Sequence, residues 1–260
     1  MSLNRHMKFL FFGLIFFATV FIGTSHVYAV ETETTYRDDG NATLWDGKWS
    51  FIQEWKRTSY TDAGGTALRI GHDYKYLYVF LDAIEQEKFT KNSDYGIVCI
   101  TSNTSTENTP QSDDHCFLVS LDTSNAITLQ GGSDLLLTDH FTRVDNDPRF
   151  IAISNVSDDN DRYTSNPHPS YEFRIPIDLV GRSDKYHLYA GTYDTVNNHM
   201  SSWPANIDTM KFPNIPSPSQ WGDLISPDKS IPEFPWPMLA LILSFIPILI
   251  IKQKIVTLNE

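Results

Sequence analysis

Two parts of the chain combine residue types that suit a ligand site, and the first is rich in amides. The segment 197–206, NNHMSSWPAN, places three asparagines and a histidine beside a tryptophan. An indole ring offers a flat apolar surface to the C–H face of a sugar, and amide groups bind sugar hydroxyls. We therefore predict Trp203 as a stacking platform and Asn198 as a hydroxyl ligand. Trp49 and Trp55 are weaker candidates, because core positions suit them better.

The second part is an acidic loop. The segment 157–162, SDDNDR, contains Asp158, Asp159 and Asp161. Carboxylate oxygens that converge from loops are the ligands that Ca²⁺ prefers, although the spacing lacks the glycine and the final glutamate of an EF-hand. We predict a calcium site at these three residues. The alternative is an acidic loop that is simply solvated.

Enzyme motifs and nucleic-acid signatures are missing from the sequence. It contains no GxSxG, no HExxH and no glycine-rich phosphate loop, so we predict that the protein is not an enzyme. The formal net charge of −12 would repel phosphate backbones, which excludes nucleic acid as a partner.

Haem is a further ligand to consider, because methionine and histidine are common axial ligands. Met200 and Met210 are the methionines of the central region, and no CxxCH attachment motif is present. The candidate histidines there are His72, His115, His168, His187 and His199. His199 and Met200 are neighbours in sequence, so they could not bind one iron from opposite sides.

Cysteines and sequons indicate an exported domain. Cys99 and Cys116 are the two cysteines, and each lies in a strand-like segment, YGIVCI and HCFLVSLD. An oxidising compartment favours a disulfide between them, across neighbouring strands. The N-x-S/T sequons at Asn41, Asn103 and Asn155 predict glycosylation.

Both ends of the chain carry apolar segments. A basic start, an apolar run and small residues predict a signal peptide over residues 1–29, with an uncleaved anchor helix as the alternative. Residues 232–251 are long and apolar enough to cross a bilayer, and the lysines that follow predict a cytoplasmic tail at 252–260. Residues 216–231 are rich in proline and serine, which predicts a stalk. We therefore expect a domain at the cell surface, anchored in the membrane.

The carboxyl end also resembles the PEF-CTERM sorting signals of archaeal surface proteins. The matching residues are Pro232, Glu233 and Phe234, followed by the span and by Lys252 and Lys254. The resemblance implies processing by an archaeosortase-like enzyme, which would replace the span with a lipid. A plain single-pass anchor is the alternative.

Short strand-like runs separated by turn residues fill the middle of the chain, and only 176–181 has the look of a helical turn. This spacing predicts an antiparallel β-sandwich, jelly-roll or immunoglobulin-like, over residues 30–215. The predicted strands are 67–72, the part of 71–82 that follows the turn HDYK (72–75), 94–100, 115–121, 126–130, 150–154, 171–175, 186–193 and 200–203.

Five segments, in order, resemble the family 9 carbohydrate-binding modules and the wider DOMON-like group of β-sandwiches. They are DGKWSFIQEW (46–55), ALRIGHDYKYLYVFLDA (67–83), DYGIVCI (94–100), YEFRIPIDLVG (171–181) and HLYAGTYD (187–194). The resemblance implies a sandwich that binds sugars, often with structural calcium, while relatives with this fold bind haem in electron transfer. It also implies that Leu77, Val79 and Leu81 face the core. The opposite, aromatic face of that strand is then expected to be covered by a loop, since large exposed aromatic patches are uncommon.

These expectations combine into one functional prediction with two alternatives. The prediction is a non-catalytic carbohydrate-binding module at the cell surface, holding polysaccharide for carbohydrate catabolism. The alternatives are a structural glycoprotein of the cell envelope that binds no small ligand, and a haem-binding electron-transfer domain.

Overall fold

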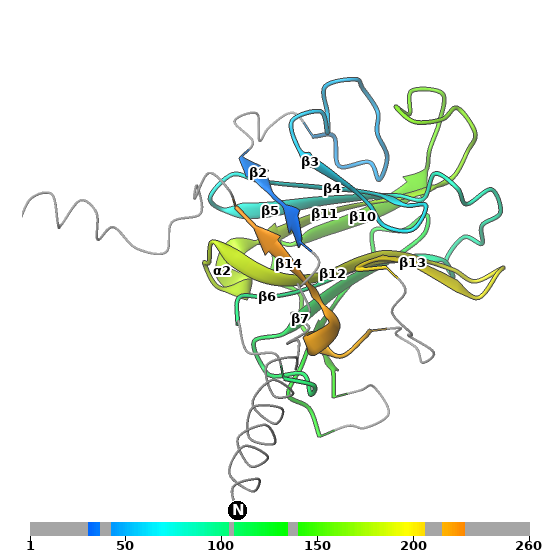
Figure 1. Ribbon diagram of the computed structural model, residues 1–260. Coiled ribbons are helices and arrows are strands. Elements are labelled where there is room, and N and C mark those ends of the chain that lie inside the picture. Colours follow the sequence, from blue (N-terminus) through cyan, green and yellow to red (C-terminus); the bar gives the residue numbers. More distant parts are fainter. Residues whose placement is uncertain (1–30, 37–42, 104–106, 135–139, 206–214, 227–260) are drawn as a thin grey trace, which may run out of the picture.

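The structure is a computed structural model that describes residues 31–36, 43–103, 107–134, 140–205 and 215–226. Over these ranges the chain forms two β-sheets that pack face to face, as Figure 1 shows. The predicted antiparallel sandwich is therefore confirmed. Its helical content in these ranges is limited to short turns, α2 (Ile177–Val180) and the 3-10 turn η2 (Pro218–Gln220).

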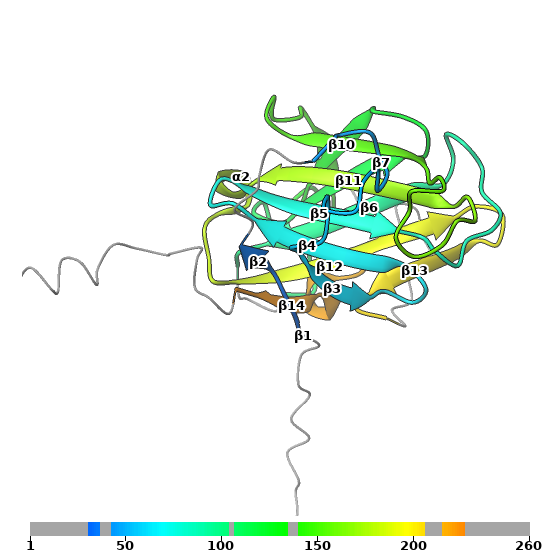
Figure 2. The same ribbon diagram turned by 90° about the horizontal axis from the view of Figure 1, so that it is seen from above.

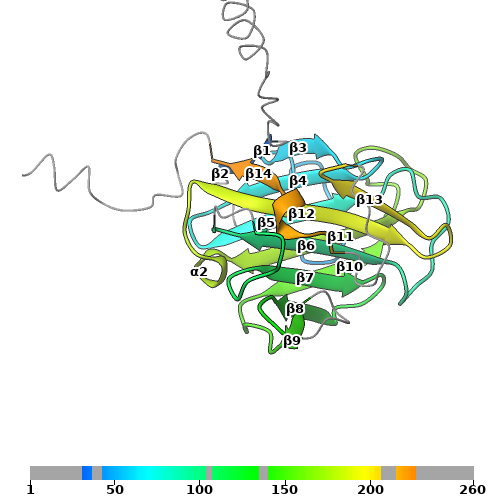
Figure 3. The same ribbon diagram turned by 60° about the horizontal axis from the view of Figure 1, so that its bottom comes forward.

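The larger sheet has eight strands among the described residues (Figure 3). In spatial order they are β1 (Glu31–Glu33), β14 (Gly222–Ile225), β12 (Lys185–Asp194), β6 (Tyr95–Thr101), β7 (His115–Ser120), β8 (Ala126–Gln130) and β9 (Thr142–Val144), and β13 (His199–Trp203) pairs with β12 as a hairpin. All of these pairs are antiparallel except β1 with β14, which run parallel at the sheet edge.

The smaller sheet has six strands among the described residues (Figure 2). They are β10 (Ile151–Val156), β11 (Pro169–Pro176), β5 (Tyr76–Asp82), β4 (Ala67–His72) and β2 (Thr35–Tyr36), with β3 (Ser59–Asp62) on β4. β2 runs parallel to β4. Residues 31–36 thus begin in one sheet and end in the other, which ties both sheets together at this edge.

The strand β5 explains the two-faced pattern of its sequence. Leu77, Val79 and Leu81 are fully buried in the core between the sheets. Side chains alternate along a strand, so Tyr78 and Phe80 point to the outer side of the smaller sheet. Here they pack against tryptophans of residues 43–58, which we call the cover segment. The expectation of a covered aromatic face is correct.

Glu172 alone accepts three hydrogen bonds that help to fasten the cover segment to the sheet. Glu172 of β11 accepts the backbone N–H groups of Gly47 (2.8 Å) and Asp46 (3.1 Å). Its other oxygen accepts the indole N–H of Trp55 at 3.1 Å. Because Glu172 is fully buried, these donors replace the water that its carboxyl group loses.

The disulfide forms as predicted. Cys99 of β6 and Cys116 of β7 are directly paired residues of neighbouring strands, with Cα atoms 4.0 Å apart. Both are fully buried on the outer side of the larger sheet.

One predicted domain boundary, between the sandwich and the stalk at residue 215, falls where the structure can be compared with it. β14 lies inside the segment 216–231 that the sequence indicated as a stalk, yet it pairs with β12 and belongs to the sandwich. The sandwich therefore continues past residue 215. Within the described ranges no helix is both long and apolar enough to cross a membrane. The predicted signal peptide (1–29), membrane span (232–251) and tail (252–260) lie outside those ranges.

Candidate functional site

A polar cleft of about 350 Å³ opens at one end of the sandwich, and we call it the end cleft. Turns of both sheets contribute to it: Gly64–Thr66 between β3 and β4, the residues after β5, and the β12–β13 hairpin. Its lining residues are Gly64, Gly65, Thr66, Ala83, Glu85, Gln86, Thr192, Asp194, Asn197, His199 and Ser201. Eight of these eleven residues have a polar side chain, so the cleft suits a ligand rich in hydroxyl groups.

Local hydrogen bonds hold the hairpin wall of this cleft. One oxygen of Asp194 accepts the backbone N–H groups of Val196 (2.8 Å) and Asn197 (3.1 Å), and the other accepts the Asn197 side-chain amide at 2.6 Å. Two other lining residues, Thr66 and Thr192, come from different sheets, and their hydroxyl groups lie 2.7 Å apart and join the two sheets. The exposed carboxylate of Glu85 completes the opposite wall.

The predicted stacking platform does not face the cleft. Trp203 is 3% exposed, because its ring packs in the core between the sheets. His199 and Ser201 lie on the same face of β13 as Trp203, and these two residues do line the cleft. Trp203 is the next residue on that face and lies deeper, between the sheets. Asn198 turns away, with a left-handed φ of 50° and its Oδ1 accepting the Tyr193 hydroxyl at 2.6 Å. Neither of the two predicted residues lines the cleft, whereas Asn197, His199 and Ser201 of the same hairpin do.

Trp49 and Trp55 are fully buried in the cover segment. The Trp55 ring stacks on Phe80 at 5.1 Å between centroids, and Trp49 meets the same ring edge-on at 6.0 Å. Their place in the structure is packing against β5, which leaves no ring face for a ligand.

The three aspartates of the predicted calcium site do not converge. Asp158 pairs with Lys48, and its other oxygen accepts the backbone N–H of Asn160 at 2.9 Å. Asp159 is exposed to solvent. Asp161 alone turns inward, towards Asp82 and His168. Of the three, the structure groups Asp161 with other potential metal ligands.

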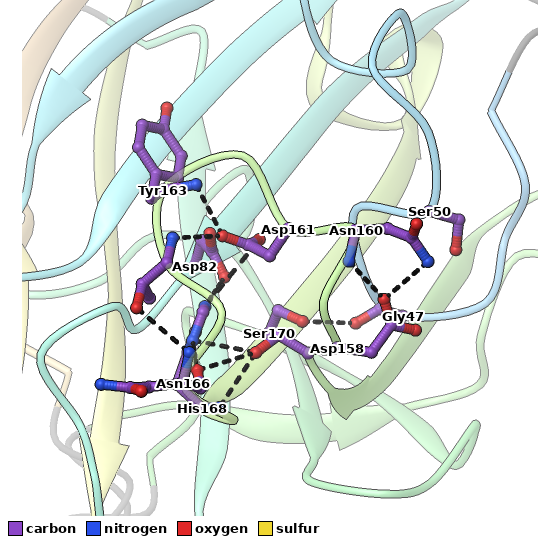
Figure 4. A network of polar contacts seen from close by, with 12 residues as sticks. Gly47, Ser50, Asp82, Asp158, Asn160, Asp161, Tyr163, Asn166, His168 and Ser170 are labelled. Carbon is purple, nitrogen blue, oxygen red and sulfur yellow. Dashed lines mark hydrogen bonds and ion pairs between the residues drawn. The ribbon is translucent and has the colours of Figure 1, made fainter.

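Asp82, Asp161 and His168 form a buried group, which we call the His–carboxylate cluster and which Figure 4 shows. The His168 Nε2 atom lies 2.7 Å from Asp82 Oδ1 and 4.0 Å from Asp161 Oδ2. Asp82 ends β5, and its paired residue on β11 is Ser170, two positions after His168. Strand pairing therefore brings together residues that are 86 positions apart.

Burial sets the electrostatics of this cluster. It raises the pKa of Asp82 to about 7, although the hydrogen bond with His168 acts in the opposite direction. Against the lowering effect of burial, the hydrogen bond and charge of Asp82 raise the pKa of His168. The cluster therefore favours holding positive charge, as protons or as a cation.

The remaining predicted sites have these positions. Met200 packs on the outer side of the larger sheet, away from the cleft that His199 lines, and Met210 lies outside the described residues. Asn41 also lies outside them, and Asn103 is half-buried. The Asn155 side-chain amide donates to the Asp46 carbonyl at 3.1 Å, so a glycan there would replace a contact of the cover segment.

No family model matches the sequence, and no curated protein matches it either. Among solved structures, the fold is similar to a family 9 carbohydrate-binding module from Caldicellulosiruptor kristjanssonii in complex with cellotriose. The TM-score is 0.49 and the identity 12%, covering 77% of this chain and 97% of that one. A family 9 module of the same organism in complex with glucose gives a TM-score of 0.47 at 12% identity, covering 75% and 95%.

Proposed function

We propose that the protein is a non-catalytic carbohydrate-binding module whose ligand site is the end cleft. The observation that carries the proposal is the lining of that cleft by carboxylate, amide, imidazole and hydroxyl groups from both sheets. Its volume of about 350 Å³ falls at the small end of the range for ligand pockets, which suits one or two sugar rings. The order of the five sequence segments that resemble family 9 modules also supports it.

The cleft lining defines what the ligand must offer. Its lining residues include no Trp, Tyr or Phe, so recognition would rest on hydrogen bonds more than on stacking. Glu85 and Asp194 are its carboxylates. Both oxygens of Asp194 accept hydrogen bonds from the hairpin, so the exposed Glu85 is the carboxylate that would accept from two neighbouring sugar hydroxyls. The positions of these acceptors favour a neutral sugar over an acidic one.

Binding to a glycan panel tests this proposal. The purified full chain is titrated with mono- and oligosaccharides, including glucose and cellotriose, by calorimetry and by thermal shift. Glu85→Ala should weaken the binding by about 10- to 100-fold, the value of a lost hydrogen bond to a charged group. Glu87→Ala is the matched control, because this residue is also exposed but does not line the cleft. Absence of any bound glycan would refute the proposal and favour a structural envelope protein.

We also propose that the module is held at the cell surface by the apolar segment 232–251, where it would retain polysaccharide for degradation by other enzymes. The composition of that segment and the lysines after it support this part of the proposal. Fractionation of cells that express the chain with and without residues 232–260 tests it. If the shortened chain stays with the membranes, this segment is not the anchor.

A further inference from the structure

The His–carboxylate cluster contains more negative charge than its protein neighbours balance. The Asp82 and Asp161 side chains are 0% and 1% exposed. Among the described residues, the one basic side chain that pairs with them is His168. Two buried carboxylates beside one imidazole leave a charge uncompensated, which is costly in a medium of low polarity.

Two oxygen atoms of the cluster are also without hydrogen bonds. Asp82 Oδ2 and Asp161 Oδ2 are buried, and neither has a hydrogen-bond partner. Buried polar atoms nearly always have one, so this pair indicates a missing ligand. Both belong to the three-residue group whose donor atoms lie within 4.8 Å of one another.

Neighbouring groups orient the three side chains towards a common point (Figure 4). The carbonyl of Asn166 lies 2.7 Å from His168 Nδ1, and the Ser157 hydroxyl lies 2.9 Å from the same atom, which turns Nε2 towards the carboxylates. Asp161 Oδ1 accepts the backbone N–H groups of Tyr163 (2.7 Å) and Thr164 (3.1 Å). Its Oδ2 atom is thereby directed into the cluster. Metal ligands in proteins are held by outer partners of this kind.

The ligand types and their spacing select the cation. A divalent ion would neutralise both carboxylates, and an imidazole ligand favours Zn²⁺ over Ca²⁺ or Mg²⁺. In a tetrahedral Zn²⁺ site the ligand atoms lie about 3.3 Å apart. The observed separations of 2.7 Å and 4.0 Å from His168 Nε2 lie on either side of that value, so small rotations of side chains would suffice.

We propose that Asp82, Asp161 and His168 bind one Zn²⁺ ion. The ion would fasten the loop 157–168 to the end of β5, which neighbours Ala83 of the end cleft. This site is separate from sugar binding, and it takes its ligands from the end of β5 and from the loop 157–168 rather than from the acidic run 157–162 alone.

Metal loading of the full chain tests the proposal. Tag-free protein is stripped with a chelator and titrated with Zn²⁺, and bound metal is measured by mass spectrometry. We expect one Zn²⁺ per chain and a rise in melting temperature. At a free Zn²⁺ concentration of 100 times Kd, the ratio of folded to unfolded protein should rise about 100-fold. Loading with Co²⁺ should produce the visible absorption of a tetrahedral ion.

Two variants make the test specific. Asp161→Asn keeps the oxygen that accepts the two backbone N–H groups and so should remain folded, but it should lose the Zn²⁺ and the thermal shift. Asp159→Asn changes an exposed aspartate of the same loop and should keep both. A wild-type chain that takes up no Zn²⁺ would show that the cluster holds protons instead, and the proposal would be wrong. Stabilisation by Ca²⁺ alone, or Zn²⁺ uptake unchanged in Asp161→Asn, would also overturn it.

Discussion

Gly47, the one glycine of the cover segment, should be highly sensitive to substitution. Its φ of +84° lies in the left-handed region, and an added Cβ would lie 2.6 Å from the backbone nitrogen of Asn155. Its N–H donates to Glu172 and its carbonyl accepts the Ser170 hydroxyl, each at 2.8 Å. Alanine at this position cannot fit unless the cover segment moves away from the sheet.

The expected cost combines three effects. The left-handed backbone costs an alanine about 1–2 kcal/mol. The clash with β10 adds about 1–3 kcal/mol, as for other overpacked sites. Weakening the hydrogen bonds to Glu172 and Ser170 adds about 1 kcal/mol. Gly47→Ala should therefore lower the free energy of unfolding by about 4 kcal/mol.

Gly64→Ala is the matched control. Gly64 has a similar φ of +68°, but an added Cβ would meet its nearest atom at 3.8 Å, an ordinary contact. Only the backbone effect of about 1–2 kcal/mol should remain. Urea unfolding followed by tryptophan fluorescence measures both variants, since three tryptophans lie in the cover segment. If the two variants lose the same stability to within about 0.5 kcal/mol, the close approach of Gly47 to β10 does not fasten the cover segment.

Three further predictions concern the core and its buried groups. Replacing Cys99 and Cys116 together by alanine should cost about 3 kcal/mol or more in urea unfolding, because the bridge closes a loop of 17 residues; an unchanged midpoint would contradict this. Burial raises the pKa of Glu172 well above its usual value, so wild-type stability should fall as pH rises above 4.5, by up to about 1.4 kcal/mol per pH unit, and Glu172→Gln should lack this slope; parallel pH profiles of the two would refute it. Trp203→Ala should cost about 3–5 kcal/mol, as for other buried tryptophans; a loss below 1 kcal/mol would mean that the ring is not in the core.

Regular strands with strong patterns were predictable from the sequence. β4 and β8 have the predicted bounds, and β6, β7, β10, β11, β12 and β13 differ from them by at most two residues at either end. Their apolar residues recur with period two between turn residues, which is the clearest local signal of a strand. The disulfide was predictable for the same reason, because both cysteines lie in such runs.

The strands that the sequence did not predict are short and lie near sheet edges. β1, β2, β3, β9 and β14 have two to four residues each, too few to show a period. Edge strands also bury one side less completely, as the alternating half-buried and exposed residues of β3 show. Long-range pairing, rather than local preference, makes these segments strands.

The candidate sites were harder to predict because they depend on register. Nothing near Asp82 in sequence indicates a ligand, and only its pairing with Ser170 places it beside His168. Trp203 illustrates the opposite error. Its asparagine-rich surroundings indicated a surface position, yet alternation along β13 directs its ring into the core. A single sequence reveals which residues are present but not which of two faces each one takes.

The parallel pairing of β1 with β14 has a mechanical consequence. Glu31 pairs with Asp223 and Glu33 with Ile225, so the first and last described strands run side by side in the same direction. A force that pulls residue 31 and residue 225 apart would drag the two strands past each other along their length. Every hydrogen bond between them would then be loaded at once, in shear, instead of opening one after another.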